Sequence, residues 1–200
     1  MPKPIEFWFD FSSPYAYFAS FRIDEIAARH GRAVDWRPFL LGVVFKTTGQ
    51  GPLTHSTMRG RYAQHDWVRL ARRMKVPFMM PESFPLRAQA ASRAFYWLDD
   101  RDPPKARELA HAIWKAFFGE GRDMTPPDAV AEVAAGLGLD KAALLAGIES
   151  PAIKERLKAE TERGMAQGVF GSPFFLIDGE GFWGNDRLDE IDAWLSAGGW

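Results

Sequence analysis

The sequence contains no cysteine among its 200 residues. This absence excludes disulfide bonds, thiolate metal sites and cysteine nucleophiles, so any sulfur chemistry must come from a bound ligand. No apolar run approaches the ~20 residues that a membrane-spanning helix requires. The opening residues, MPKPIEFWFDF, also lack the apolar core and the cleavage site of a secretory signal. We therefore expect a cytoplasmic protein without membrane association.

Positive charge is not in excess, since 25 Lys and Arg residues stand against 26 Asp and Glu residues. A general nucleic-acid-binding protein has a basic footprint, so we expect no nucleic-acid partner. A basic stretch does run from Arg59 to Lys75. Such a stretch is typical of a solvated helix face, and the alternative is a surface that attracts an anionic substrate. The four histidines show no metal-ligand spacing such as H-x-x-x-H, and we expect no metal site.

The first part of the chain reads as a strand, a helix and a second strand. Aromatic and apolar residues predict a buried strand over 5–11, and a helix is expected from Pro14 to about Gly31. A second strand is expected over 33–40, parallel to the first. Residues 41–57 are rich in Gly and Thr and predict a loop.

The remaining residues divide into a helical block and a short mixed segment. Helical patterns separated by prolines dominate residues 58–167, whereas residues 168–200 predict two strands, a GEG turn and a final helix. The order βαβ, helices, ββα predicts an α/β protein. We expect a thioredoxin-like core of residues 1–57 and 168–200, with an all-helical domain of residues 58–167 inserted between its halves.

Ser13 lies in FDFSSPYAYF, between the first strand and the first helix. Backbone N–H groups and the helix dipole at such a position favour negative charge, so a ligand thiolate would be stabilised there. The alternative is that Ser12 or Ser13 only caps the helix, which serine does well.

Pro173 opens a strand in GVFGSPFF. A proline in this position suggests an edge strand, with the backbone of the preceding residue, Ser172, turned toward a ligand. The Ser172–Pro173 bond is either cis or part of an ordinary turn.

FWGNDRL places Asn185, Asp186 and Arg187 at the start of the last helix. These residues read either as a helix cap with a solvated arginine or as a polar pocket for the charged amino-acid end of a peptide ligand.

Together these motifs resemble the 2-hydroxychromene-2-carboxylate isomerases and the similar kappa-class glutathione transferases. The resemblance covers both ends of the chain and the helical block. It rests on FWFDFSSPYAY at Phe7–Tyr17, TGQGP at Thr48–Pro52, GRYAQHDWVRLAR at Gly60–Arg72, GVFGSPFF at Gly168–Phe175 and FWGNDRLDEI at Phe182–Ile191.

The resemblance implies a fold like that of the disulfide oxidoreductase DsbA, with glutathione as the cofactor. Ser13 matches the serine at the glutathione sulfur, and Pro173 matches the cis-proline. Ser172 would pair through its backbone with the cysteinyl part, and Phe170 would add to that wall. The glutamyl end would lie against Trp183, Gly184, Asn185 and Asp186.

The sequence departs from the resembled pattern in its middle segment. Gln50 stands where an Asn is common, and it still offers hydrogen bonds to glutathione. The places that face the substrate in the naphthalene-pathway isomerases hold Thr54, His55 and Phe84. These departures put the chromene substrate in doubt more than they do glutathione.

The implied activity is isomerisation of 2-hydroxychromene-2-carboxylate to trans-o-hydroxybenzylidenepyruvate, a step of aromatic degradation. A thiolate suits it, because a nucleophile that adds to a double bond allows rotation and then leaves again. One alternative is a kappa-like glutathione transferase or peroxidase that acts on another electrophile. The other is a non-enzymatic glutathione-binding module. Similar proteins are often dimers, so we also expect a homodimer.

Overall fold

A four-stranded sheet lies at the centre of the computed structural model, which describes residues 2–54 and 57–200. The strand order is β2-β1-β3-β4, and β1 pairs parallel with β2 and antiparallel with β3. The sheet thus joins the two ends of the chain, and the parallel pairing of the first two strands is confirmed. The strands are β1 (Ile5–Phe9), β2 (Val34–Pro38), β3 (Phe174–Ile177) and β4 (Glu180–Trp183).

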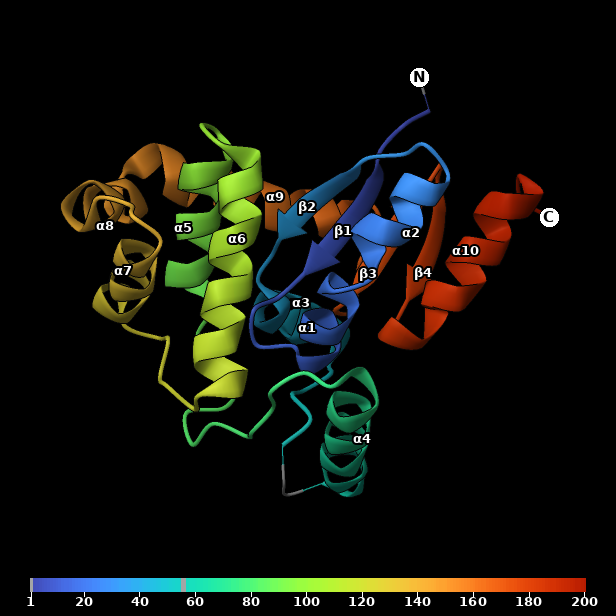
Figure 1. Cartoon of the computed structure of the whole chain (residues 1–200), viewed down its shortest axis with the longest axis horizontal. Helices are drawn as coiled ribbons and strands as arrows, with labels where there is room; N and C mark the ends of the chain where they lie inside the picture. Colours follow the sequence, from blue (N-terminus) through green and yellow to red (C-terminus); the bar gives the residue numbers. More distant parts are fainter. Residues whose placement is uncertain (1, 55–56) are drawn as a thin grey trace.

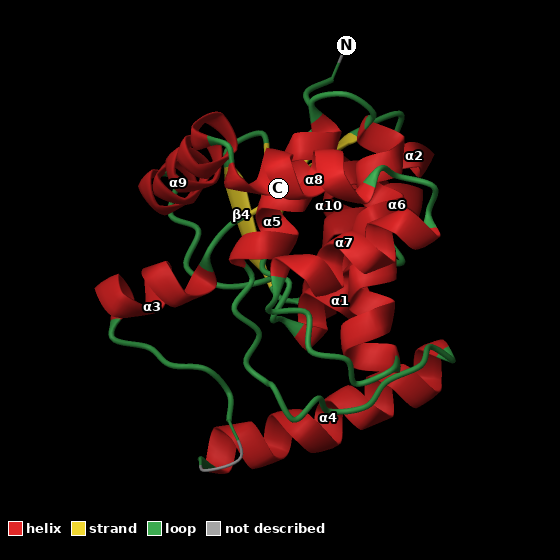
Figure 2. Ribbon diagram, turned by 90° about the vertical axis from the view of Figure 1, so that its left-hand side faces the viewer, coloured by secondary structure: helices red, strands yellow, loops and turns green. Residues whose placement is uncertain are grey.

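Helices cover both faces of this sheet. In Figure 1, α1 and α2 lie on one face and α9 lies on the other, while α5–α8 gather beside β2 and α10 lies beside β4. Figure 2 shows α3 and α4 extending away from the other helices. The helices are α1 (Pro14–Ser20), α2 (Ile23–Arg29), α3 (Leu41–Thr48), α4 (Met58–Met74), α5 (Gln89–Asp99), α6 (Pro103–Trp114), α7 (Pro127–Gly136), α8 (Lys141–Glu149), α9 (Pro151–Ala166) and α10 (Leu188–Ala197), with a π-helical turn at Lys115–Gly119 and a 3-10 turn at Asn185–Arg187. None of the helices in the described part of the chain has the length and apolarity needed to cross a bilayer.

Three predictions about local structure are wrong. The strand that follows Pro173, expected at an edge of the sheet, is β3, which pairs with β1 on one side and β4 on the other. The helix expected from Pro14 to Gly31 is interrupted between α1 and α2. The loop expected over 41–57 begins with a helix, α3, which ends at Gly49 with a φ of +70°. This helix is stabilised from outside its own sequence, because Val44 is buried in one apolar cluster with Trp8 of β1 and because the Leu41 N–H donates to the carboxylate of Asp10.

Aromatic side chains join the sheet to the helical block. Successive side chains of a strand point to opposite faces, so Trp8 faces α9 while Phe9 faces the opposite layer. The Phe9 ring lies 5.7 Å from Phe95 of α5 and 5.1 Å from Trp114 of α6, measured between centroids. It also lies 5.6 Å from Trp36 of β2. The sheet and the helices of residues 58–167 therefore share one core, and the division into a core and an insertion at these boundaries remains a prediction.

We expect Phe9→Ala to lower the free energy of unfolding by about 3–5 kcal/mol, because it leaves a cavity among five aromatic rings. Denaturant unfolding followed by circular dichroism measures this change. Met58→Ala is the control, since Met58 is 80% exposed and its removal should alter stability by less than about 0.5 kcal/mol. Equal effects of the two substitutions would contradict the central place of Phe9 in the core.

Candidate functional site

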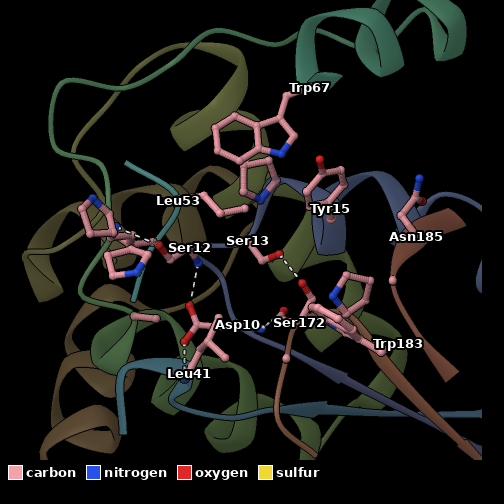
Figure 3. A pocket seen from close by; sticks show the side chains of 18 of the residues that line it. Asp10, Ser12, Ser13, Tyr15, Leu41, Leu53, Trp67, Ser172, Trp183 and Asn185 are labelled. Carbon is pink, nitrogen blue, oxygen red and sulfur yellow. Dashed lines mark hydrogen bonds between the residues drawn. The ribbon is translucent and has the colours of Figure 1, made fainter. Parts of the chain in front are cut away.

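A cleft of about 1490 Å³ opens where the ends of β1, β2 and β3 meet helices α1, α3 and α4. Its floor contains the segment after β1, the segment before β3 and the turn before α10 (Figure 3). Its walls come from α3, from α4 and from residues 84–89. The three motifs found at the two ends of the sequence thus meet in one cavity.

Ser13 both caps α1 and lines this cleft. Its side-chain oxygen accepts a hydrogen bond from the Ala16 N–H at 3.2 Å, which is the geometry of a helix N-cap. The same hydroxyl donates to the Ser172 carbonyl at 2.8 Å, and the residue is only 7% exposed. The capping role and the position in the cleft are therefore compatible.

The segment before β3 faces Ser13. The Ser172–Pro173 peptide bond is cis, which was one of the two alternatives that the sequence left open. The Ser172 hydroxyl accepts the Asp10 N–H at 2.8 Å, so this segment is tied to the end of β1. The Pro173 carbonyl accepts the Gly184 N–H at 3.1 Å, which brings the turn before α10 to the same place.

The turn before α10 adds polar groups to the other end of the cleft. Gly184 has a φ of +117°, and a Cβ there would lie 2.4 Å from Asp186 Oδ1, so only glycine fits. Asn185 is 8% exposed, and its Oδ1 has no partner among the described residues. Neither Asn185 nor Asp186 makes the predicted capping hydrogen bond at the start of α10, and Asp186 instead pairs with Arg187 at 3.3 Å.

Most of the residues predicted for the site lie together. Phe170 lies behind Trp183, with ring centroids 4.9 Å apart, while the Trp183 ring is 47% exposed and borders the cleft. Thr54 is not among the described lining residues, and His55 lies outside the described residues. The predicted residues that line the cleft are Ser13, Gln50, Phe84, Ser172, Pro173, Trp183, Gly184, Asn185 and Asp186.

Asp10 is a buried carboxylate in the floor of the cleft that sequence reasoning missed. It is 4% exposed, and burial raises its pKa to about 6 although two backbone hydrogen bonds oppose the shift. Its Oδ1 accepts the Ser12 N–H at 2.7 Å, and its Oδ2 accepts the Leu41 N–H at 2.8 Å. A charged residue inside the apolar run IEFWFDF was the signal that could have found it.

A second hydrogen-bond network places α4 over the cleft. The Tyr15 hydroxyl donates to Asp66 of α4 at 2.8 Å, and Asp66 also pairs with Arg69 at 2.7 Å. Burial, together with the neighbouring Asp66, raises the pKa of Tyr15. The Tyr15 ring also packs edge-on against Trp67, with centroids 5.9 Å apart. Tyr15 thus fixes one wall of the cleft and remains protonated at neutral pH.

The walls carry positive charge. Lys46 of α3, Arg59 and Arg73 of α4, and Arg87 all line the cleft. None of the four forms an ion pair with another described residue. Two members of the basic stretch noticed in the sequence therefore face this cavity. Within residues 2–54 and 57–200 no cluster of His, Asp and Glu is arranged to hold a metal ion.

Comparison with known proteins gives a consistent result. A family model described as a DSBA-like thioredoxin domain matches residues 4–196. A 2-hydroxychromene-2-carboxylate isomerase of Sphingobium xenophagum is 29% identical over 98% of this chain and 99% of its own length. A kappa-class glutathione S-transferase of Caenorhabditis elegans is 27% identical over 97% of this chain and 92% of its own length. A solved 2-hydroxychromene-2-carboxylate isomerase superposes with a TM-score of 0.86 at 25% identity, covering 96% of this chain and 94% of that one.

We expect the folded protein to lose stability as the pH rises, because the ionised carboxylate of Asp10 is unfavourable in its buried position. The folded protein binds this proton more tightly than the unfolded chain, so the group favours folding below pH 3.8 and the benefit is lost as the pH rises through about 6. Relative to Asp10→Asn, the wild type should lose about 2 kcal/mol of unfolding free energy between pH 4.5 and 7.5. Urea unfolding of both proteins at several pH values measures the difference.

Thr161→Val is the matched control for this measurement. Thr161 accepts the neighbouring Leu40 N–H at 3.2 Å but carries no titratable group, so its stability difference from the wild type should not change with pH. A flat difference for Asp10→Asn as well would mean that the Asp10 pKa is not raised.

Proposed function

Because the chain belongs to the DSBA-like thioredoxin domain family and has no cysteine, we propose that it binds glutathione and uses it as the cofactor of an isomerase of the 2-hydroxychromene-2-carboxylate type. The observation that carries the proposal is Ser13, a hydroxyl at a helix N-terminus that faces the backbone before a cis-proline. Bound glutathione would supply a thiol that, once ionised, adds reversibly to a carbon–carbon double bond.

The residues of the cleft fit a peptide thiol. Ser13 would donate a hydrogen bond to the sulfur, and the N-terminus of α1 would favour its negative charge. The Ser172 carbonyl is an acceptor for a peptide N–H, and the buried Asn185 Oδ1 still needs a donor such as the amino group of a glutamyl end. Gln50 and Trp183 would complete the walls.

The charge of the cleft supports a substrate that bears a carboxylate. Lys46, Arg59, Arg73 and Arg87 line the cavity without ion-pair partners among the described residues. Such groups attract an anion and raise its local concentration. This observation favours the isomerase over a transferase of neutral electrophiles.

The second candidate is a kappa-like glutathione transferase or peroxidase. It is favoured by the middle segment, where Thr54 and His55 replace the residues expected to face a chromene substrate. It shares the proposed role of Ser13, and only the fate of glutathione separates the two. A non-enzymatic glutathione-binding module is the third candidate.

The proposal also implies a setting for the protein. Reduced glutathione is maintained in reducing compartments, so we place the chain in the cytoplasm. The expected homodimer remains a prediction that sedimentation analysis can test.

We expect Ser13→Ala to weaken glutathione binding at least ~10-fold and to raise the pH midpoint of the bound thiolate band by about 1, because a hydrogen bond to a charged group is lost. Calorimetry and the ultraviolet thiolate absorbance measure the two effects. Ser150→Ala is the matched control, since Ser150 caps α9 and donates to the Gly147 carbonyl at 2.8 Å in the same manner, away from this cleft. Absence of binding by the wild type at millimolar glutathione would sink the proposal.

A second measurement separates isomerase from transferase. With 2-hydroxychromene-2-carboxylate as substrate, we expect product to form while the concentration of free thiol stays constant. The product is followed by its absorbance and glutathione by a thiol reagent. Consumption of one glutathione for each substrate molecule would favour the transferase, and binding without turnover of any electrophile would favour the binding module.

A further inference from the structure

Ser12 is held as firmly as Ser13 but performs no capping role. Its N–H donates to Asp10 Oδ1 at 2.7 Å, and its side-chain oxygen accepts the Leu86 N–H at 3.1 Å. The first bond comes from the end of β1 and the second from the segment that follows the cis Phe84–Pro85 bond. Ser12 is half-buried and lines the cleft.

The hydroxyl hydrogen of Ser12 has no acceptor within the described part of the chain. A serine hydroxyl has one hydrogen to donate and two lone pairs that accept. Leu86 uses the acceptor side, whereas no described residue accepts from Ser12 Oγ. Ser13 differs, because its hydrogen is donated to the Ser172 carbonyl. Ser12 therefore presents an unused donor beside the proposed sulfur position.

Ser12 and Ser13 serve different ends of the cleft. Figure 3 shows Ser13 between Ser12 on one side and Trp183 and Asn185 on the other. The lining around Ser12 includes the apolar side chains of Leu41, Leu53 and Leu86 together with the carboxylate of Asp10. A mainly apolar lining with a few placed polar groups is typical of a site for a small organic molecule.

We propose that Ser12 determines substrate specificity by donating a hydrogen bond to an oxygen atom of the electrophile. The inference rests on the proposed glutathione site at Ser13. In this role, Ser12 selects electrophiles with a carbonyl oxygen close to the carbon that the sulfur attacks. Such an oxygen gains negative charge when a nucleophile adds to the conjugated bond, and a fixed donor stabilises that charge.

Two matched glutathione derivatives test this role without turnover. S-(3-oxo-3-phenylpropyl)glutathione has its carbonyl one methylene beyond the carbon bonded to sulfur, as in the adduct of a conjugated ketone, and S-(3-phenylpropyl)glutathione has a methylene in place of that carbonyl. In Ser12→Ala we expect the ketone to lose about 3- to 10-fold in affinity relative to the compound without a carbonyl, which is the effect of one hydrogen bond. Titration calorimetry of each ligand with each protein measures the ratio of the two dissociation constants.

Three variants distinguish donation from packing. Ser12→Thr keeps the hydroxyl and should restore the wild-type ratio. Ser20→Ala removes a hydroxyl of α1 that donates to the Tyr17 carbonyl at 2.7 Å away from the cleft, and should leave the ratio unchanged. Ser12→Cys has only a weak donor and should shift the ratio as alanine does, which covers the case that Ser12→Ala does not fold.

The outcomes separate the two proposals. If the wild type binds both ligands and the ratio of their dissociation constants is unchanged in Ser12→Ala and in Ser12→Cys, the role of Ser12 is overturned while the proposed glutathione site stands. A shift that Ser12→Thr does not restore also overturns it, because the effect would then be one of packing. If the wild type binds neither ligand, the glutathione site itself is wrong and the inference fails with it.

Discussion

Hydrogen bonds to Asp10 hold the floor of the cleft together. Its main-chain N–H donates to the Ser172 hydroxyl, and its carbonyl accepts the Ser13 N–H. Its carboxylate accepts the N–H groups of Ser12 and Leu41. One residue at the end of β1 thus fixes the serine pair, the cis-proline segment and the start of α3 relative to one another. Burial of this carboxylate disfavours its charged form and raises its pKa, and the backbone donors only partly offset that effect.

The parts of the site that the sequence predicted are those determined by neighbouring residues. Ser13 precedes Pro14 at a helix start, and Pro173 follows Gly-Ser at a strand start, so each has a local signature. The parallel pairing of β1 with β2 also follows from adjacent elements. The resemblance to a known family then placed these motifs in one fold, which the comparisons confirm.

What the sequence did not predict depends on contacts between distant segments. Helix α3 begins a Gly- and Thr-rich segment, whose composition predicts a loop. The N–H of its first residue, Leu41, donates to the carboxylate of Asp10, 31 residues earlier in the sequence. The acceptor role of Ser12 involves Leu86, 74 positions away. At the break between α1 and α2, Arg22 pairs with Asp189 of α10 at 2.5 Å, another contact between distant segments. The residue pattern within a single segment cannot predict such contacts between distant segments.

The single hydrogen of the Ser13 hydroxyl would make the proposed sulfur position and the proposed peptide position interdependent. That hydrogen is shared with the Ser172 carbonyl, and a hydroxyl donates to one acceptor at a time. A ligand whose sulfur takes this hydrogen leaves the carbonyl without its donor in a buried place, where an unmatched acceptor is unfavourable. A ligand that donates its own main-chain N–H to the Ser172 carbonyl replaces the lost hydrogen bond, whereas a simple thiol has no such donor. If the cleft binds glutathione as proposed, it would discriminate between thiols by exchange of a hydrogen-bond donor, and the peptide backbone attached to the sulfur would contribute to the binding of the sulfur itself.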